Sequence, residues 1–163
     1  MKATKILIVA GGVVALSVVT LGGSSRVAHA ASGAEALAAR KAVMRSISGH
    51  FGAIKGAILS GNKKRIQGAA RHAMAINGLS RSIAFVTPKG SGQSAGKSTA
   101  LNKIWTDWAG FNKAAGRLTT ESAKLVAVLK AGNPKASMSQ FGRTGKVACG
   151  GCHGTYRVKK KKR

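Results

Sequence analysis

Residues 99–131 read TALNKIWTDWAGFNKAAGRLTTESAKLVAVLKA, and this stretch decides the fold class. One set of positions recurs every three or four residues along all of it, which is the spacing of a single helix face. Gly132-Asn133-Pro134 then ends the pattern. The sequence therefore predicts one amphipathic helix over residues 99–131. The recurring positions, all apolar except the serine, are Leu101, Ile104, Trp108, Phe111, Ala115, Leu118, Ser122, Leu125 and Leu129.

Three further segments carry the same kind of pattern. We predict helices over residues 34–60, 63–86 and 135–158, with a Gly/Ser-rich loop over 89–98. No segment shows the two-residue alternation of a half-buried strand. Four amphipathic helices joined by short or medium connections predict an all-α fold, an antiparallel four-helix bundle.

The N-terminal segment, residues 1–30, is typical of a secretory signal peptide. Lys2 and Lys5 give it a charged start, residues 6–21 are mostly apolar, and Ala28-His29-Ala30 is a small-x-small cleavage site. A retained transmembrane anchor is the alternative, but glycine, serine and threonine interrupt the apolar run. We therefore expect export to the periplasm and cleavage near Ala30.

The charge of the chain is strongly unbalanced. The chain has 28 Lys and Arg residues and only three acids, Glu35, Asp107 and Glu121, so its formal net charge is +25. Such a surface favours acidic partner proteins and anionic surfaces, with at most peripheral membrane contact. Nucleic-acid binding is the alternative, but predicted export and the even spread of basic residues over the predicted domain, 31–163, argue against it. Only the tail, residues 158–163, forms a basic block, and we expect it to be frayed.

The sequence Cys149-Gly150-Gly151-Cys152-His153 contains both cysteines of the chain. On a helix, the two thiols lie three residues apart on one face. Thiols at this spacing can bond to the two vinyl groups of a haem while the next imidazole binds its iron. A redox dithiol would need a βαβ context, and a zinc site would need more ligands than the sequence offers. The motif predicts one covalent haem c, with His153 as an iron ligand.

The predicted first helix holds further candidate haem contacts. Arg40 stands where the seam expects an apolar residue, between Leu37 and Met44. A buried guanidinium needs a partner, and haem offers two propionates; snorkelling from the seam edge is the alternative. Lys41 could assist from the rim. Met44 lies one turn further along the same face, where its thioether could be the second axial ligand or could simply fill the core.

Other candidates carry weaker signals. His50 and His72 are rival iron ligands, and Met74 and Met138 are expected in the core. Arg157 follows the motif histidine by four residues, so it could tune the site or be one more exposed cation. No set of nucleophile, base and acid is visible, and we expect no enzymatic activity.

Three segments together resemble the cytochrome c-prime family. They are RKAVM at residues 40–44, IWTDWAGF at residues 104–111, and the C-terminal segment 149–157, and the likeness extends over the whole predicted domain. Lys41 departs from the family pattern, where glutamine is common.

The resemblance implies a four-helix bundle with thioethers at Cys149 and Cys152, His153 as proximal ligand, Arg40 at a propionate and Met44 at the distal position. Low-spin members use a distal methionine and carry electrons, whereas high-spin members leave the site open and bind nitric oxide or carbon monoxide. With Met44 at the distal position, this chain is more similar to the low-spin members. We therefore expect a periplasmic one-electron carrier, with a gas-binding protein as the alternative. The resemblance also allows a homodimer.

Overall fold

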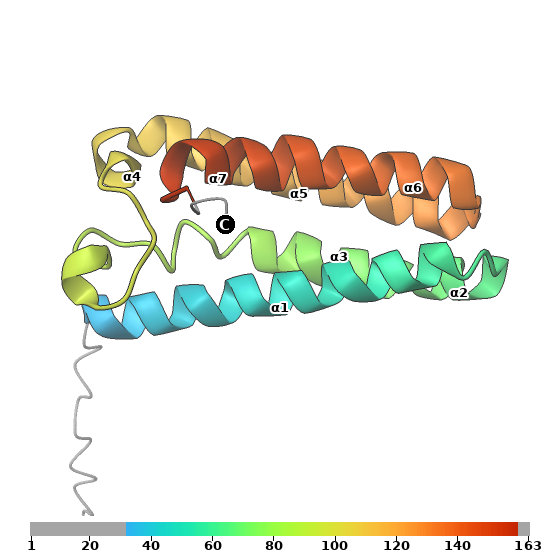
Figure 1. The fold of residues 1–163 in the computed structure, drawn as a ribbon, viewed down its shortest axis with the longest axis horizontal. Helices are drawn as coiled ribbons and strands as arrows, with labels where there is room; N and C mark the ends of the chain where they lie inside the picture. Colours follow the sequence, from blue (N-terminus) through green and yellow to red (C-terminus); the bar gives the residue numbers. More distant parts are fainter. Residues whose placement is uncertain (1–31, 160–163) are drawn as a thin grey trace, which may run out of the picture.

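Four helical segments run in alternating directions along the molecule (Figure 1). The computed structural model describes residues 32–159, so the predicted signal peptide (1–30) and the end of the basic tail lie outside the described residues. Within this part, the only β-type pairing is an isolated antiparallel bridge between Ala100 and Arg157. The predicted all-α antiparallel four-helix bundle is confirmed. Its helices are α1 (Gly33–Leu59), α2 (Lys63–Gly68), α3 (Ala70–Ser80), α4 (Lys103–Thr106), α5 (Trp108–Ala131), α6 (Pro134–Arg143), a π-helix (Thr144–Gly150) and α7 (Gly151–Tyr156).

Helix α1 begins at a capping box. The Ser32 hydroxyl accepts a hydrogen bond from the Glu35 backbone N–H at 3.2 Å, and the Glu35 carboxylate accepts one from the Ser32 N–H at 2.7 Å. Two donors at the helix start are thereby satisfied, which fixes where α1 begins. These bonds also hold the pKa of Glu35 below its usual value.

The second predicted helix is shorter than expected. It consists of α2 and α3 and ends at Ser80, whereas residues 81–86 form turns rather than the predicted continuation. The Ser80 hydroxyl donates to the Asn77 carbonyl and the Ser82 hydroxyl to the Leu79 carbonyl. Such short-range bonds offer the backbone an alternative to the α-helical ladder, which explains the early end.

The third predicted helix, 99–131, is interrupted. The single turn α4 precedes Asp107, which leaves the helical conformation at φ −129°, and α5 starts at the next residue. The Asp107 carboxylate accepts a hydrogen bond from the Gly110 N–H at 3.1 Å and so caps α5. Gly132 ends α5 at φ 73°, a left-handed conformation that favours glycine.

The fourth predicted helix, 135–158, contains a π-helix that the pattern did not predict. Asn133 caps α6, Pro134 opens it, and the π-helix follows from Thr144 to Gly150. The Thr144 hydroxyl donates to the Gln140 carbonyl at 2.8 Å, where the helical ladder loosens. Isolated π-helical turns often mark functional sites, and this one leads directly into the cysteine motif.

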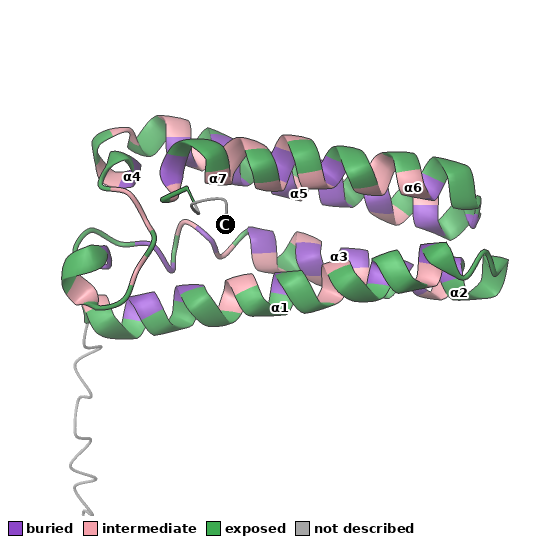
Figure 2. Cartoon of the chain, in the orientation of Figure 1, coloured by how far each residue is buried: buried purple, intermediate pink, exposed green. Residues whose placement is uncertain are grey.

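The core lies along the inner faces of the four segments (Figure 2). Its fully buried aliphatic side chains are Ile54, Ile66, Ile76, Leu125 and Leu129. Burying each such side chain stabilises the fold by about 1.5–3 kcal/mol. Contacts between aliphatic side chains therefore contribute most of the packing between the four helical segments.

One carboxylate is buried in this bundle. Glu121 on α5 accepts hydrogen bonds from Gln140 at 2.8 Å and Arg143 at 3.2 Å on α6, and from Lys124 at 3.1 Å. The Gln140 bond is the largest cause of the lowered pKa of Glu121. This cluster joins α5 to α6 just before the π-helix.

Candidate haem site

The two thiols lie at the junction of the π-helix and α7. Cys149 and Cys152 are both free and half-buried, and both pack against the hydrophobic core. Burial raises the pKa of each thiol, and the nearby Cys149 raises that of Cys152 further, while the charge of Arg117 opposes the shift at Cys152. Both thiols are therefore protonated at neutral pH, and both keep an exposed part.

The imidazole of His153 is also half-buried. Burial lowers its pKa, and the positive charge of Arg157 lowers it further. A lowered pKa keeps the ring neutral at neutral pH, which is the form that binds metal ions. Arg157 thus acts on His153 through its charge, while its own side chain is half-buried beside the Ala100 bridge.

The end of α7 is held by the segment that precedes α5. The Leu101 N–H donates to the Tyr156 carbonyl at 3.0 Å, and the Val158 N–H donates to the Thr99 carbonyl at 2.8 Å. The Tyr156 hydroxyl donates to the Asp107 carboxylate at 2.7 Å. This bond lowers the pKa of Asp107 and raises the pKa of Tyr156 to about 12. These contacts orient the helix that carries His153.

Gly110 leaves space for the hydrogen bond between Tyr156 and Asp107. A Cβ atom at Gly110 would collide with both the Asp107 carboxylate and the Tyr156 hydroxyl. The Tyr156 ring also meets Phe111 edge-on, with ring centroids 5.5 Å apart. The absence of a side chain at position 110 is therefore required for the Asp107–Tyr156 bond.

Arg40 is buried, as predicted, with 8% of its surface exposed. Its guanidinium donates to the Ser91 hydroxyl at 2.7 Å, the Ser91 carbonyl at 2.6 Å, the Val86 carbonyl at 3.5 Å and the Ser98 hydroxyl at 3.4 Å. Arg40 therefore anchors the loop that follows α3, and every one of these acceptors is neutral. Lys41 beside it is exposed. Pairing of either cation with a propionate stays a prediction.

Met44 is half-buried on α1 and packs against the same core as Cys149 and Cys152. Helix α1 packs mainly on α2, α3 and α6, whereas α7 packs on α5 and the π-helix. Met44 and His153 thus stand on two helices that are not closely packed on each other. This is the arrangement that a group inserted between them requires.

The rival histidines, His50 and His72, contact each other. The Nδ1 atoms of His50 on α1 and His72 on α3 are 2.9 Å apart, with ring centroids 5.2 Å apart. Burial is the largest cause of the lowered pKa of His72, followed by the charges of His50 and Arg71. Met138 packs against the core as predicted, but Met74 is 56% exposed, so its predicted core role is wrong.

Several residues of the site were not predicted from the sequence. Ser91 and Ser98 fall in a loop, Arg117 was one of many basic residues, and the Asp107–Tyr156 bond joins two predicted helices. The N-cap character of Asp107, three residues before a glycine, is the one local signal that could have indicated its role.

The donor set fits a covalently bound haem c. Two free thiols and a neutral imidazole lie within one helical turn, and a half-buried thioether stands on a separate helix. The buried Arg40 guanidinium has only neutral partners, so an anionic propionate would find an uncompensated charge nearby. A bound c-type haem supplies a one-electron Fe(III)/Fe(II) couple.

Comparison with known proteins shows the family of this chain. The sequence model of the family described as Cytochrome C′ matches residues 35–157. The chain is 31% identical over 121 residues to a cytochrome c-556 of Agrobacterium tumefaciens (strain II Chrys), covering 74% of this chain and 95% of that protein. A cytochrome c-556 of Agrobacterium fabrum is also 31% identical, over 74% of this chain and 80% of that protein.

Solved structures show the same architecture. A variant of cytochrome c prime from Alcaligenes xylosoxidans in complex with nitric oxide superposes with a TM-score of 0.68 at 22% identity, over 79% of this chain and 98% of that chain. Cytochrome c′ from Rubrivivax gelatinosus superposes with a TM-score of 0.64 at 25% identity, over 78% of this chain and 98% of that chain.

Proposed function

This chain belongs to the cytochrome c′ family, and from that premise we propose that it is a periplasmic one-electron carrier whose haem iron is held between His153 and Met44. It is a c-type cytochrome that binds haem c covalently. In the proposed site, Cys149 and Cys152 form the two thioethers. His153 binds the proximal face of the iron through its neutral ring.

The observation that carries the electron-transfer proposal is the position of Met44. Its thioether is half-buried and packs against the same core as Cys149 and Cys152, but from α1. A neutral imidazole and a neutral thioether together raise the reduction potential of the iron. Two fixed ligands also leave the geometry almost unchanged between oxidation states, which suits a carrier. The cytochromes c-556 that the chain is similar to support this assignment.

The test is Met44→Leu in the purified holo-protein, followed by visible absorption of the ferric form. We expect the wild type to be low-spin with a weak sulfur-to-iron band, and the variant to become high-spin and lose that band. Met138→Leu is the matched control, because Met138 also packs against the core but lies on α6. If Met44→Leu leaves the spectrum unchanged, Met44 is not a ligand.

The second candidate function is binding of a diatomic gas at an open distal face. It is favoured by the likeness to a cytochrome c prime solved in complex with nitric oxide. Here Met44 would only fill space. Rapid carbon monoxide binding to the ferrous wild type would support this function, whereas slow binding that Met44→Leu accelerates would support the carrier.

Location and partners follow from charge and export. None of the helices within residues 32–159 is both long and apolar enough to cross a bilayer. The predicted signal peptide would direct the chain to the periplasm. Of the 28 Lys and Arg residues, 25 (28 − 3) lie outside the predicted signal peptide, and this excess of positive charge favours an acidic redox partner and would accelerate encounter at low ionic strength. We propose electron transfer to such a partner rather than catalysis.

A further inference from the structure

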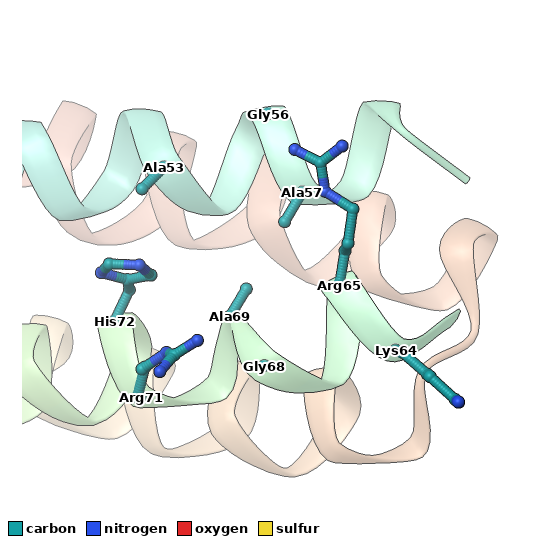
Figure 3. Close-up of a pocket in the computed structure, with 9 residues that line it drawn as sticks. All are labelled: Ala53, Gly56, Ala57, Lys64, Arg65, Gly68, Ala69, Arg71 and His72. Carbon is teal, nitrogen blue, oxygen red and sulfur yellow. The ribbon is translucent and has the colours of Figure 1, made fainter. Parts of the chain in front are cut away.

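A groove of about 650 Å³ lies between α1 and the α2–α3 segment (Figure 3). Its residues are small except for three cations, Lys64, Arg65 and Arg71, and the imidazole of His72. Arg65 extends from α2 toward α1, and Arg71 and His72 come from α3, with Lys64 at the outer edge. The groove lies near α2, whereas the cysteine motif lies at the junction of the π-helix and α7, and α7 lies nearer the other end of the bundle (Figure 1). It is therefore a feature separate from the haem site.

The cations of this groove have no carboxylate to neutralise them. The chain contains three acids. Glu35 belongs to the cap of α1, Asp107 accepts from Tyr156 and Gly110, and Glu121 accepts from α6 and Lys124. Each side-chain carboxylate is bonded elsewhere, so within residues 32–159 no carboxylate neutralises the cations of the groove.

The floor of the groove gives a ligand close access to the backbone. Ala53, Gly56 and Ala57 line it from α1, and Gly68 and Ala69 line it from the opposite side. A Cβ at Gly56 would meet nothing within 4 Å. The floor therefore offers little side-chain bulk and no negative charge.

The donors are of the kind that recognises phosphoryl groups. Arg65 and Arg71 each present a planar guanidinium, which binds phosphate oxygens in pairs. A Cβ at Gly68 would lie 3.6 Å from an Arg71 Nη atom, so this guanidinium lies over the floor. Nδ1 of His72 is paired with Nδ1 of His50, and in the tautomer where His50 donates in this pair the Nε2–H of neutral His72 is left to donate to a ligand. The volume falls within the usual range of small-molecule sites, about 300–1,000 Å³.

We propose that this groove binds a small oxyanion of the pyrophosphate class, with one phosphoryl group at each of Arg65 and Arg71 and with His72 as a further donor. Two guanidiniums on two successive helices offer two binding points, and a ligand with two linked phosphoryl groups can use both. Lys64 would add attraction from the edge without a fixed contact.

The test is calorimetric titration of the purified holo-protein with pyrophosphate at neutral pH and low ionic strength. We expect saturable binding at one site. Arg65→Gln/Arg71→Gln should weaken binding at least about tenfold, since each lost guanidinium removes charge-assisted hydrogen bonds. If the double variant binds pyrophosphate as the wild type does, the anion is attracted by the general surface charge and the proposal is wrong.

A second pair of variants tests the site without removing its donors. Gly56→Glu places a carboxylate on the groove floor, and Gly116→Glu places one on the exposed surface of α5; neither new Cβ meets an atom within 4 Å. Both variants change the net charge equally. Only Gly56→Glu should abolish binding, and equal effects would overturn the proposal. The haem spectrum should be unchanged in both, so failure here is distinguishable from failure of the electron-carrier assignment.

Discussion

Replacing Arg40 with methionine should release the loop over residues 86–98 from α1. The guanidinium makes two short hydrogen bonds to Ser91, at 2.7 and 2.6 Å, and two bonds near the distance limit, at 3.4 and 3.5 Å. A hydrogen bond to a charged group contributes about 1.5–3 kcal/mol, and the two long ones contribute little. Methionine avoids burying a charge, which offsets part of the loss. We therefore expect a net cost of about 3 kcal/mol to the closed loop, or about a hundredfold in its opening equilibrium.

Limited trypsin digestion of the holo-protein measures this opening directly. Lys89 and Lys97 are exposed cleavage sites within the loop. When reclosing is faster than cleavage, the cleavage rate follows the population of the open state. Cleavage after these two lysines should therefore accelerate about a hundredfold in Arg40→Met, with a parallel fall in the free energy of unfolding in guanidinium chloride.

Two further variants separate the contributions of Arg40. Arg45→Met makes the same exchange at an exposed position of α1 and should leave loop cleavage unchanged. Arg40→Lys keeps the charge but cannot reach both Ser91 oxygens as a planar fork can. If loop anchoring dominates, Arg40→Lys should resemble Arg40→Met, and if a propionate charge dominates, it should resemble the wild type. Unchanged cleavage and unfolding in Arg40→Met would refute the anchoring role.

Three other outcomes can be checked by unfolding experiments. Gly110→Ala should lower the stability by about 1–3 kcal/mol through overpacking, whereas Gly116→Ala, in open space, should raise it by up to about 1 kcal/mol; equal midpoints in thermal melts would contradict this. Because the folded pKa of Asp107 is lowered and that of Tyr156 is raised to about 12, the stability advantage of the wild type over Tyr156→Phe should be full at neutral pH. Denaturant titrations should show that this advantage is lost as pH falls through the folded pKa of Asp107. It should also be lost as pH rises from about 10 to about 12, where the Tyr156 hydroxyl ionises. Leu125→Ala, at a fully buried position, should cost about 2–5 kcal/mol, and a smaller loss in guanidinium chloride would mean that the core there can collapse.

Apolar periodicity located the helices but not their interruptions. The pattern over residues 99–131 continues through Asp107 because Ile104 before the break and Phe111 after it are both buried, although Trp108, which the pattern placed on the same face, is 40% exposed. Periodicity reports which side faces the core, and it is insensitive to a polar residue that caps a new helix. The π-helix over residues 144–150 was not predicted for a similar reason, since the apolar pattern does not report the spacing of the backbone hydrogen bonds.

The sequence predicted that Arg40 would be buried, but it did not predict the hydrogen-bond partners of Arg40 or of His50. The seam position of Arg40 indicated that it would be buried, and it is. Its partner Ser91 lies 51 residues away in a loop, and two of its four acceptors are backbone carbonyls, which every residue carries. The His50–His72 contact joins residues 22 apart on two helices. Such pairs depend on how the helices pack, which a single sequence does not specify.

The scarcity of carboxylates affects the stability of this protein at low pH. Most proteins unfold in acid partly because protonated carboxylates leave a large excess of positive charge, which repels itself. This chain already carries that excess at neutral pH, and strong acid adds only three charges from side-chain carboxylates and at most four from histidines. The folded state of this chain is therefore stable at neutral pH under a positive charge that most proteins acquire only in acid. Acidification should act on it through individual groups: the three bonded carboxylates, at the start of α1, at the start of α5 and between α5 and α6, and the half-buried imidazoles of His72 and His153, whose pKa values are lowered.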